Sequence, residues 1–484
     1  MRVLIANRGE VAIRIIRTCE ELGYTSILLH STPDKNTLAY RLAHEKFELQ
    51  GTSAAETYLN IPKVVEAAKK TKADFVHPGF GFLSENAQFV EALEKARINF
   101  VGPPSSAIKI AGHKIRAKEL AQSLGVPVIP SFTGQETSPD KLLKEVQKVG
   151  FPCIIKAAAG GGGKGMKVAR QEKEFFELYE SAQREAKNAF GSDVVFIEKY
   201  LERPRHIEVQ IFFDRIQNGI HLFERECSIQ RRHQKIFEES PAQSLTQNLR
   251  EQITAAALKI AKGAGYKNAG TVEFLLDNDG KFYFMELNTR LQVEHTVTEL
   301  VLGLDLVQWQ FAVASGHSLP LKQEQIVPRG HAMEVRIYAE NPEREFLPST
   351  GQITDLVFPL GPNRRYDFGY AIGDIITTYY DPMIGKVITW APTRNENIAR
   401  MRATLDELII FGVHTNIEFL KSVLENRHFQ EGQLSTRFLD EEYPRGFNPK
   451  PLTKAQRDFA DQARLRPEDN ASVTGLIYES PWNG

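Results

Sequence analysis

The hydrophobic pattern of the first hundred residues predicts alternating strands and helices. Short apolar runs at Val3–Ala6, Ser26–Leu29 and Asp74–His77 are typical of buried strands, and an amphipathic stretch from Glu10 to Leu22 predicts a helix. Strands that alternate with helices in this way favour βαβ units and a parallel sheet. The turn after the first strand holds one glycine and no GxGxxG, so the pattern argues against a nicotinamide site there.

Beyond Gly102 the pattern predicts one helix over Ile108–Leu124 and then two strand-rich units. The expected elements of these units are strands at 153–156, 166–168, 194–198 and 206–213 and a helix at 175–187. A linker is expected at Gln323–Gly330, followed by several strands and a helix near Glu396–Leu408. A charged, proline-rich tail is expected after Tyr443.

Between Glu286 and Glu294 polar and less polar side chains alternate. The polar ones are Glu286, Asn288, Arg290, Gln292 and Glu294. An extended strand would place all of them on one face, but at ~3.3 Å per residue that face would be ~26 Å long, more than one active site spans. We therefore expect a bend near Thr289, after which the last three polar residues surround a small anion.

The stretches Thr271–Leu276 and Lys281–Leu287 flank Asp-Asn-Asp-Gly, which predicts a hairpin. Pairing across this turn places Glu273 near Phe284 and makes Glu286 its diagonal neighbour on one face. Two such carboxylates repel unless they share a cation, and Mg²⁺ prefers oxygen ligands, of which Asn288 could add a third. The alternative is an exposed acidic rung bridged by Lys or Arg.

Two further stretches suggest phosphate binding. The run Gly160–Gly165 contains Lys164 and lies between two expected strands, so its backbone N–H groups could approach phosphate oxygens as a mobile lid. It lacks the Walker A pattern, and the alternative is a flexible hairpin tip. The stretch Cys227–Lys235 carries Gln230 and His233, which could contact phosphate and sugar, although a solvated basic face is the more usual reading.

Composition narrows the class of protein. The chain has 484 residues, a formal net charge of −1 and three cysteines without metal-type spacing. A near-neutral charge argues against a nucleic-acid-binding surface. The cysteine usage fits a reducing compartment, and neither a signal peptide nor an apolar run of roughly 20 residues stands out. We expect a cytoplasmic protein with no nucleic-acid or membrane partner.

Taken together, these motifs resemble the ATP-grasp superfamily and, within it, the biotin carboxylase family, over residues 1 to about 442. The motifs that carry the resemblance are Ile5–Glu10, His77–Asn86, Ile155–Ala157 with the glycine run, Arg225–Lys235, Met285–His295 and Tyr379–Lys386. The resemblance implies an α/β (α+β overall) ATP-grasp fold. It implies a Rossmann-like parallel-sheet domain at 1–112, an ATP-grasp domain at 113–322 with a mobile lid at about 126–200, and a biotin carboxylase C-terminal domain at 331–442. The tail at 443–484 is left without a role.

The resemblance also implies roles for individual residues. Contacts to ATP are expected from Lys114, Lys156, Gly161, Gly162, Gly163, Met166, Glu198, Lys199, Leu201, His206, Gln230, His233, Lys235 and Leu275, and metal ligands from Glu273, Glu286 and Asn288. Bicarbonate and biotin would be held by Phe80, Arg290, Gln292 and Val293. Glu294 would be the base that activates bicarbonate, and Arg336 would stabilise the biotin enolate.

The implied activity is ATP-dependent carboxylation of biotin by bicarbonate through carboxyphosphate, with Mg²⁺ or Mn²⁺. The stretch Gly165–Val168 lacks the flanks of a biotin-attachment site, so we expect a separate biotin carrier protein, a carboxyltransferase subunit, and a homodimer of this chain. Two alternatives stay open: another ATP-grasp ligase that joins a carboxylate to an amine, and a nucleotide-binding regulatory subunit without turnover. Departures from the family pattern include Phe80, Thr296 and Ala158-Ala159.

Overall fold

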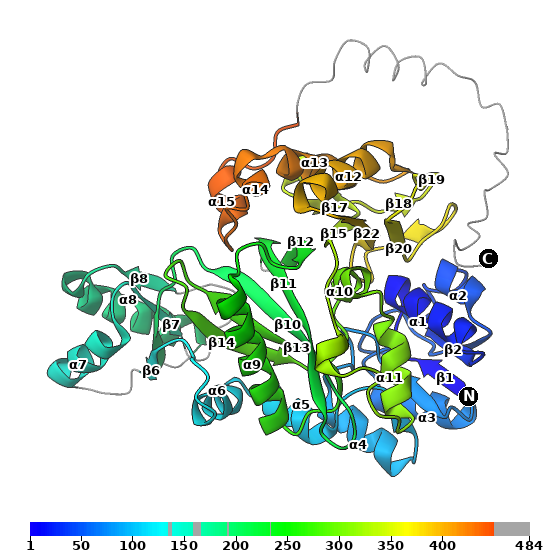
Figure 1. Cartoon of the computed structure of the whole chain (residues 1–484), viewed down its shortest axis with the longest axis horizontal. Helices are drawn as coiled ribbons and strands as arrows, with labels where there is room; N and C mark the ends of the chain where they lie inside the picture. The colour runs from blue at the N-terminus through cyan, green and yellow to red at the C-terminus, as the bar shows by residue number, and fades with distance from the viewer. Residues whose placement is uncertain (134–137, 158–165, 191–192, 233, 450–484) are drawn as a thin grey trace, which may run out of the picture. The chain divides into compact units, whose positions relative to one another are not determined.

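The computed structural model describes residues 1–133, 138–157, 166–190, 193–232 and 234–449. Residues Met1–Gly446 form one compact unit. Most of the predicted tail, from residue 450 on, lies outside the described part of the chain. Figure 1 shows the elements in chain order.

The N-terminal region builds the expected parallel sheet. Its strand order is β3-β2-β1-β4-β5, with β1 (Arg2–Ile5), β2 (Thr25–His30), β3 (Glu45–Glu48), β4 (Phe75–His77) and β5 (Asn99–Phe100). Helix α1 (Gly9–Glu21) buries Val11, Ile15 and Cys19 against this sheet, as its amphipathic pattern predicts. The other helices of this region are α2 (Leu38–Leu42), α3 (Ile61–Lys70) and α4 (Ala87–Lys95).

A small four-stranded sheet follows, in the order β6-β9-β7-β8. Its strands are β6 (Ser131–Thr133), β7 (Cys153–Ala157), β8 (Lys167–Ala169) and β9 (Val195–Lys199), and its helices are α7 (Pro139–Val149) and α8 (Glu172–Phe190). Leu142, Val146, Phe175 and Ala182 from the helices form a core with the apolar side chains of β7 and β9. The glycine run falls between β7 and β8 but lies outside the described residues.

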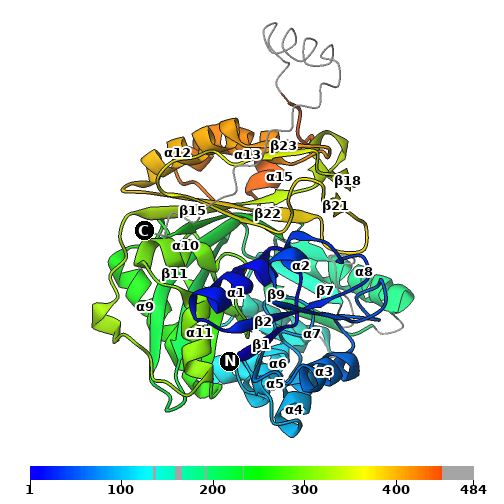
Figure 2. The ribbon, with the colours of Figure 1, turned by 90° about the vertical axis from the view of Figure 1, so that its right-hand side faces the viewer.

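The largest sheet has eight antiparallel strands in the order β14-β13-β10-β11-β12-β15-β22-β20. They are β10 (Arg205–Phe213), β11 (Gly219–Arg231), β12 (Gln234–Ser240), β13 (Asn268–Leu276), β14 (Phe282–Asn288), β15 (His331–Tyr338), β20 (Arg364–Phe368) and β22 (Met383–Ala391). Helices α9 (Gln247–Gly263), α10 (His295–Leu302) and α12 (Arg394–Glu407) pack against it (Figures 1 and 2). Pairing of β12 with β15 therefore carries one sheet across the linker expected at 323–330.

Helix α1 also contacts β20 and β22, so the N-terminal region touches the far edge of this sheet (Figure 1). Gly369, directly after β20, allows the approach: a Cβ there would lie 2.7 Å from the backbone nitrogen of Glu10.

The remaining elements are short or lie at the periphery. They are α5 (Ser105–Ala111), α6 (Lys114–Ser123), α11 (Leu306–Ala314), α13 (Ile417–Glu425), α14 (Arg427–Gln430), α15 (Phe438–Glu442), β16 (Glu340–Asn341), β17 (Leu347–Pro348), β18 (Gly351–Gln352), β19 (Asp355–Val357), β21 (Ile375–Ile376), β23 (Ile409–Phe411) and the 3₁₀ helices at Gln323–Gln325 and Pro342–Arg344. Within the described ranges, no single helix is long and apolar enough to cross a membrane. Helices α10 and α11 reach that length and hydropathy only when they are taken together, and the chain bends by 98° between them.

The prediction of one helix over Ile108–Leu124 is wrong. The chain forms α5 and α6 with a break at Gly112 and His113, because the His113 side chain accepts a hydrogen bond from the Arg116 N–H and starts a new helix. Lys114 is therefore the first residue of α6. The linker expected at Gln323–Gly330 is also packed against the rest of the protein, since its residue Ile326 is buried.

Candidate active site

Two glutamates face each other across the β13–β14 hairpin. The register pairs Phe274 with Phe284 and Glu273 with Glu286, so Met285 is the extra residue of a β-bulge. The predicted diagonal arrangement is therefore wrong, because the bulge shifts the register and brings the two carboxylates directly opposite. Burial raises the pKa of Glu286, and the charge of Glu273 raises it further.

Lys235 connects three buried carboxylates. Its Nζ lies 2.5 Å from Glu208 Oε2, 2.8 Å from Glu273 Oε1 and 2.7 Å from Glu294 Oε1. Burial would lower the pKa of Lys235, but these three carboxylates hold it well above its usual value. The charge of Lys235 is therefore fixed, and its position links the hairpin to the segment that ends at Glu294.

Glu294 is fully buried between two cations. Its Oε2 lies 3.1 Å from Arg336 Nη2, and Arg336 Nε donates to Glu238 Oε1 at 2.7 Å. Burial opposes ionisation, but Lys235 and Arg336 hold the pKa of Glu294 well below its usual range. The carboxylate is thus ionised.

The predicted bend after the strand is confirmed. Strand β14 ends at Asn288, the chain bends at Arg290, and α10 begins at His295. Arg290 Nη1 donates to Gln292 Oε1 at 2.7 Å, and Gln292 Nε2 lies 3.5 Å from Glu273 Oε1. The structure thus brings Arg290, Gln292 and Glu294 together beside the facing glutamates.

Glu85 supports this segment, and the sequence analysis missed it. Its Oε1 accepts from the Thr289 N–H at 2.9 Å, and its Oε2 accepts from Arg290 Nε at 3.0 Å. Glu85 belongs to the motif His77–Asn86. That motif supported the family resemblance, but it did not predict which residues Glu85 contacts. Glu208 was missed as well, although the alternation of His206, Glu208 and Gln210 along β10 signals a polar face.

A second group of charges lies on the small sheet. Glu198 accepts from Lys118 at 2.8 Å and from Lys156 at 2.7 Å. Burial would raise the pKa of Glu198, but the two lysines hold it below its usual value. Lys199 instead donates to the Phe151 carbonyl at 2.7 Å. The side chains of Glu198 and Lys199, both predicted to contact ATP, therefore have different partners.

His206 and Gln230 lie beside Glu273. His206 Nε2 is 3.0 Å from Glu273 Oε2, and its Nδ1 is 2.6 Å from Gln230 Nε2. The predicted nucleotide contacts on β10 and β11 therefore adjoin the predicted metal ligands.

Comparison with known protein families gives three adjacent matches. Residues 1–108 match "Biotin carboxylase, N-terminal domain", residues 113–322 match "Carbamoyl-phosphate synthase L chain, ATP binding domain", and residues 334–441 match "Biotin carboxylase C-terminal domain". A biotin carboxylase from Nostoc sp. is 48% identical over 440 residues, which are 91% of this chain and 98% of that protein. The chain belongs to the biotin carboxylase family. The predicted family, its class as an ATP-dependent ligase and the α/β ATP-grasp fold are confirmed.

Other members of the biotin carboxylase family differ in length. A pyruvate carboxylase subunit from Methanothermobacter thermautotrophicus is 48% identical over 465 residues, covering 96% of this chain and 94% of that protein. The alpha subunit of mitochondrial methylcrotonoyl-CoA carboxylase from Dictyostelium discoideum is 46% identical, but this chain spans only 63% of its length. The biotin carboxylase domain dimer of Hydrogenobacter thermophilus 2-oxoglutarate carboxylase, solved with MgADP and bicarbonate, matches with a TM-score of 0.82 at 41% identity, over 91% of this chain and 97% of that one.

The other residues expected from the biotin carboxylase resemblance differ in how exposed they are. Lys114 and Met166 are exposed, Leu201 is buried and Leu275 is half-buried. Phe80 packs against the core of the N-terminal region, and its carbonyl accepts from Asn7. Gly161, Gly162, Gly163 and His233 lie outside the described residues.

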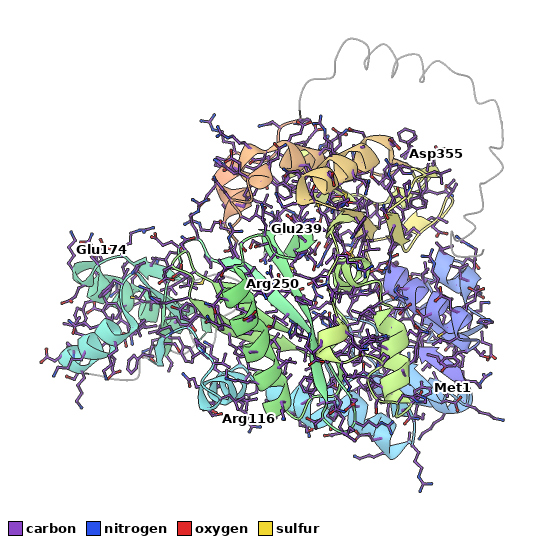
Figure 3. All side chains as sticks on the ribbon, viewed as in Figure 1. Met1, Arg116, Glu174, Glu239, Arg250 and Asp355 are labelled. Carbon is purple, nitrogen blue, oxygen red and sulfur yellow. The ribbon has the colours of Figure 1, made fainter. Side chains whose placement is uncertain are left out.

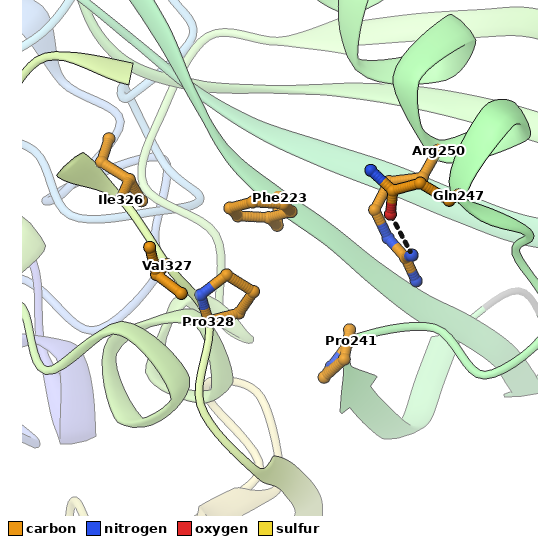
Figure 4. A pocket seen from close by; sticks show the side chains of 7 residues that line it. All are labelled: Phe223, Pro241, Gln247, Arg250, Ile326, Val327 and Pro328. Atoms are coloured by element: carbon orange, nitrogen blue, oxygen red, sulfur yellow. Dashed lines mark hydrogen bonds between the residues drawn. The ribbon is translucent and has the colours of Figure 1, made fainter. Parts of the chain in front are cut away.

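A separate hollow of about 370 Å³ lies elsewhere on this biotin carboxylase fold (Figure 4). Phe223, Pro241, Ile326, Val327 and Pro328 give it apolar walls, joined by Gln247 and Arg250. The Arg250 guanidinium, labelled in Figures 3 and 4, already donates to Glu224 and the Ala242 carbonyl. No carboxylate lines this hollow among the described residues, so it does not extend the site around Lys235.

Proposed function

We propose that this chain carries out the first half-reaction of a multi-subunit acyl-CoA or pyruvate-type carboxylase. It transfers a carboxyl group from bicarbonate to biotin on a separate carrier protein and consumes ATP. The observation that carries the proposal is the connected line from Glu273 through Lys235 and Glu294 to Arg336. This line joins oxygen ligands suited to a metal, an ionised base and a guanidinium at one site.

We assign the metal to Glu273, Glu286 and Asn288. The arrangement fits a divalent cation, because two carboxylates face each other and the raised pKa of Glu286 marks a charge without enough compensation. The Asn288 Nδ2 is buried and lacks a hydrogen-bond partner among the described residues, so the amide can turn its oxygen to a cation. Bound Mg²⁺ or Mn²⁺ would neutralise ATP phosphates and polarise the γ-phosphoryl group.

We assign the nucleotide to the charged residues around Lys235 and to those around Glu198. Lys114, Lys156 and Lys235 supply cations for the phosphates, while Glu198, Lys199 and Leu201 supply the adenine edge. Lys156 is bonded to Glu198, so it has to exchange that carboxylate for phosphate when ATP binds. His206, Gln230 and His233 complete the set, and the glycine run with Gly161, Gly162 and Gly163 acts as the lid that excludes water.

We assign bicarbonate to Arg290, Gln292 and the Val293 backbone. Glu294 takes the proton of bicarbonate, whose oxygen then attacks the γ-phosphorus, and ADP leaves. Bicarbonate is a poor nucleophile, so holding it in line with a neutralised phosphate lowers the barrier through positioning and charge stabilisation. Carboxyphosphate then breaks down to CO₂ and phosphate, and phosphate removes the proton from the biotin ureido nitrogen. Arg336 supplies positive charge for the anion that results, and the nitrogen of that anion attacks CO₂ to give carboxylated biotin.

The test is ATP hydrolysis by the isolated chain with and without bicarbonate, free biotin and Mg²⁺. We expect hydrolysis that requires bicarbonate and increases with free biotin. Turnover that is independent of bicarbonate but requires an amino acid would instead identify a carboxylate–amine ligase. Nucleotide binding with no turnover under any condition would identify a regulatory subunit.

We further propose three partners in the cytoplasm: a biotin carrier protein, a carboxyltransferase subunit, and a second copy of this chain. The Hydrogenobacter domain dimer and the subunit name of the Methanothermobacter relative support this assembly. Purification of the chain from its native cells, followed by detection of biotinylated protein and by light scattering, tests it. Absence of a biotinylated companion would argue against the separate carrier.

A further inference from the structure

A buried ionic cluster lies behind the segment proposed to hold bicarbonate. We define the cluster as Glu10, Glu334 and Lys386, whose side chains are 3%, 0% and 0% exposed. Glu10 lies in the first turn of α1, Glu334 on β15 and Lys386 on β22. Glu10 and Lys386 end the motifs Ile5–Glu10 and Tyr379–Lys386, neither of which has an assigned role in the proposed reaction.

Lys386 directs its hydrogen bond to the backbone and not to the carboxylates. Its Nζ donates to the Val293 carbonyl at 2.5 Å, but it lies 3.7 Å from Glu10 Oε1 and 3.8 Å from Glu334 Oε2. A lysine whose task is to pair with carboxylates would place its hydrogens on them at about 2.7–2.9 Å. The two glutamates therefore balance the charge of Lys386, while its donor is committed to Val293.

The neighbouring carbonyl is held from the same region of the chain. His295 Nδ1 lies 2.8 Å from the Gln292 carbonyl, and this contact needs a proton on that nitrogen. Thr296 Oγ1 donates to Glu334, which ties the first turn of α10 to the cluster. Two successive carbonyls, of Gln292 and Val293, are thus anchored by buried side chains.

Anchoring a carbonyl also orients the next amide. In a planar trans peptide the C=O and the following N–H point in opposite directions. The N–H groups of Val293 and Glu294 therefore point away from the groups that hold the preceding carbonyls. Within the described residues, neither N–H donates to another protein group. Successive backbone N–H groups of this kind bind anions.

We propose that Lys386 is a positioning residue for the bicarbonate site: by holding the Val293 carbonyl it presents the adjoining amides to the anion and fixes the backbone of the base Glu294. This inference rests on the proposed function. A purely structural Lys386 would affect stability and lower all kinetic parameters together. A positioning Lys386 affects the Michaelis constant for bicarbonate far more than that for ATP.

The experiment compares folded variants in the bicarbonate-dependent ATPase assay. The wild type is measured first: if it shows no bicarbonate dependence, the proposed function fails and this inference is not the cause. The double variant Lys386→Met with Glu10→Gln removes the donor and one opposing charge together. We expect its KM for bicarbonate to rise at least about tenfold, as displaced positioning groups cause, with the KM for ATP within about twofold of wild type.

The matched control neutralises another buried ion pair, which joins the start of α12 to strand β12 of the same sheet. Arg394 donates two hydrogen bonds to Glu239, labelled in Figure 3, and neither residue contacts the bicarbonate segment in the described structure. Arg394→Met with Glu239→Gln should lower stability while leaving the KM for bicarbonate unchanged. An unchanged KM for bicarbonate in the folded Lys386 variant, or an equal rise in the control, overturns the inference.

A second variant covers failure of the first to fold. Lys386→Arg keeps the charge that Glu10 and Glu334 require but moves the donors away from the position of Nζ. Its KM for bicarbonate should also rise selectively. A folded Lys386→Arg protein with wild-type kinetics would overturn the inference.

Discussion

The Glu294 carboxylate and the Arg336 guanidinium lie 3.1 Å apart, with both side chains removed from solvent. Because Lys235 approaches the other oxygen of Glu294 at 2.7 Å, the carboxylate has a cation on each side. Its affinity for a proton is therefore low until one of those contacts lengthens. Substrate binding at Lys235 or Arg336 is thereby coupled to the basicity of Glu294.

Glu294→Gln should abolish most turnover with little change in ATP affinity. A neutral amide cannot take the proton of bicarbonate, and loss of a general base typically costs about 10²- to 10⁴-fold in rate. The measurement is kcat for bicarbonate-dependent ATP hydrolysis, with ATP binding followed by calorimetry. The exposed Glu343→Gln carries the same chemical change and should behave as wild type. A wild-type rate in Glu294→Gln would reject Glu294 as the base.

Glu286→Gln should weaken the dependence on metal. The change removes one of the two facing carboxylates, so the Mg²⁺ concentration at half-maximal rate should increase at least about tenfold. Asp279→Asn, at the exposed turn of the same hairpin, is the matched control. If the two variants give the same Mg²⁺ titration curve, Glu286 does not bind the metal.

Glu85→Gln should raise the KM for bicarbonate by about fivefold or less. Glu85 holds Arg290 and the Thr289 amide, but it is 41% exposed, and a partly exposed ion pair contributes at most about 1 kcal/mol. Steady-state kinetics at fixed saturating ATP measures the effect. Glu91→Gln removes a surface pair with Lys109 and provides the comparison. A loss of about a hundredfold would show that Glu85 does more than orient Arg290.

Glu10→Gln should remove a pH dependence of stability between about pH 4.5 and 7. Burial raises the pKa of Glu10 from 4.5 to about 7, with Lys386 opposing that change only in part. The unfolded chain thus releases this proton first, so the contribution is complete below about pH 4.5 and is lost as the pH rises towards 7. The expected loss in the wild type, relative to the variant, is about 3 kcal/mol. Urea unfolding of both proteins at about pH 5 and pH 8 measures it, and parallel pH profiles would contradict it.

Local patterns were sufficient to predict the hairpin, the bend after Asn288 and the acidic groups that meet there. Each depends on residues close in sequence, where the period of two and the reach of an extended chain limit the possibilities. The family resemblance supplied Arg336 and Lys235, whose distance from Glu294 along the chain no local pattern can bridge. Their roles, unlike their positions, stay predictions.

Contacts that depend on strand register or on residues far apart in the chain could not be predicted from the sequence. The bulge at Met285 changes which residue faces Glu273, and the pattern of hydrophobic and polar residues in the hairpin does not predict that bulge. The targets of Glu85 and Lys386 lie 205 and 93 residues away, on elements brought together only by the folded sheets. The break between α5 and α6 was missed because His113 is an uncommon helix cap.

The pairing of Phe237 with Val335 and of Ser240 with Ala332 has a consequence for exchanging parts between relatives. A fragment that ends before His331 would keep the pairing of β12 with β11 but leave the other edge of β12 without a neighbouring strand, and bare strand edges recruit other chains. It would also lose Arg336 from Glu294. Chimeras should therefore have no junction between Gln234 and Tyr338, so that both partners of the ladder come from one parent.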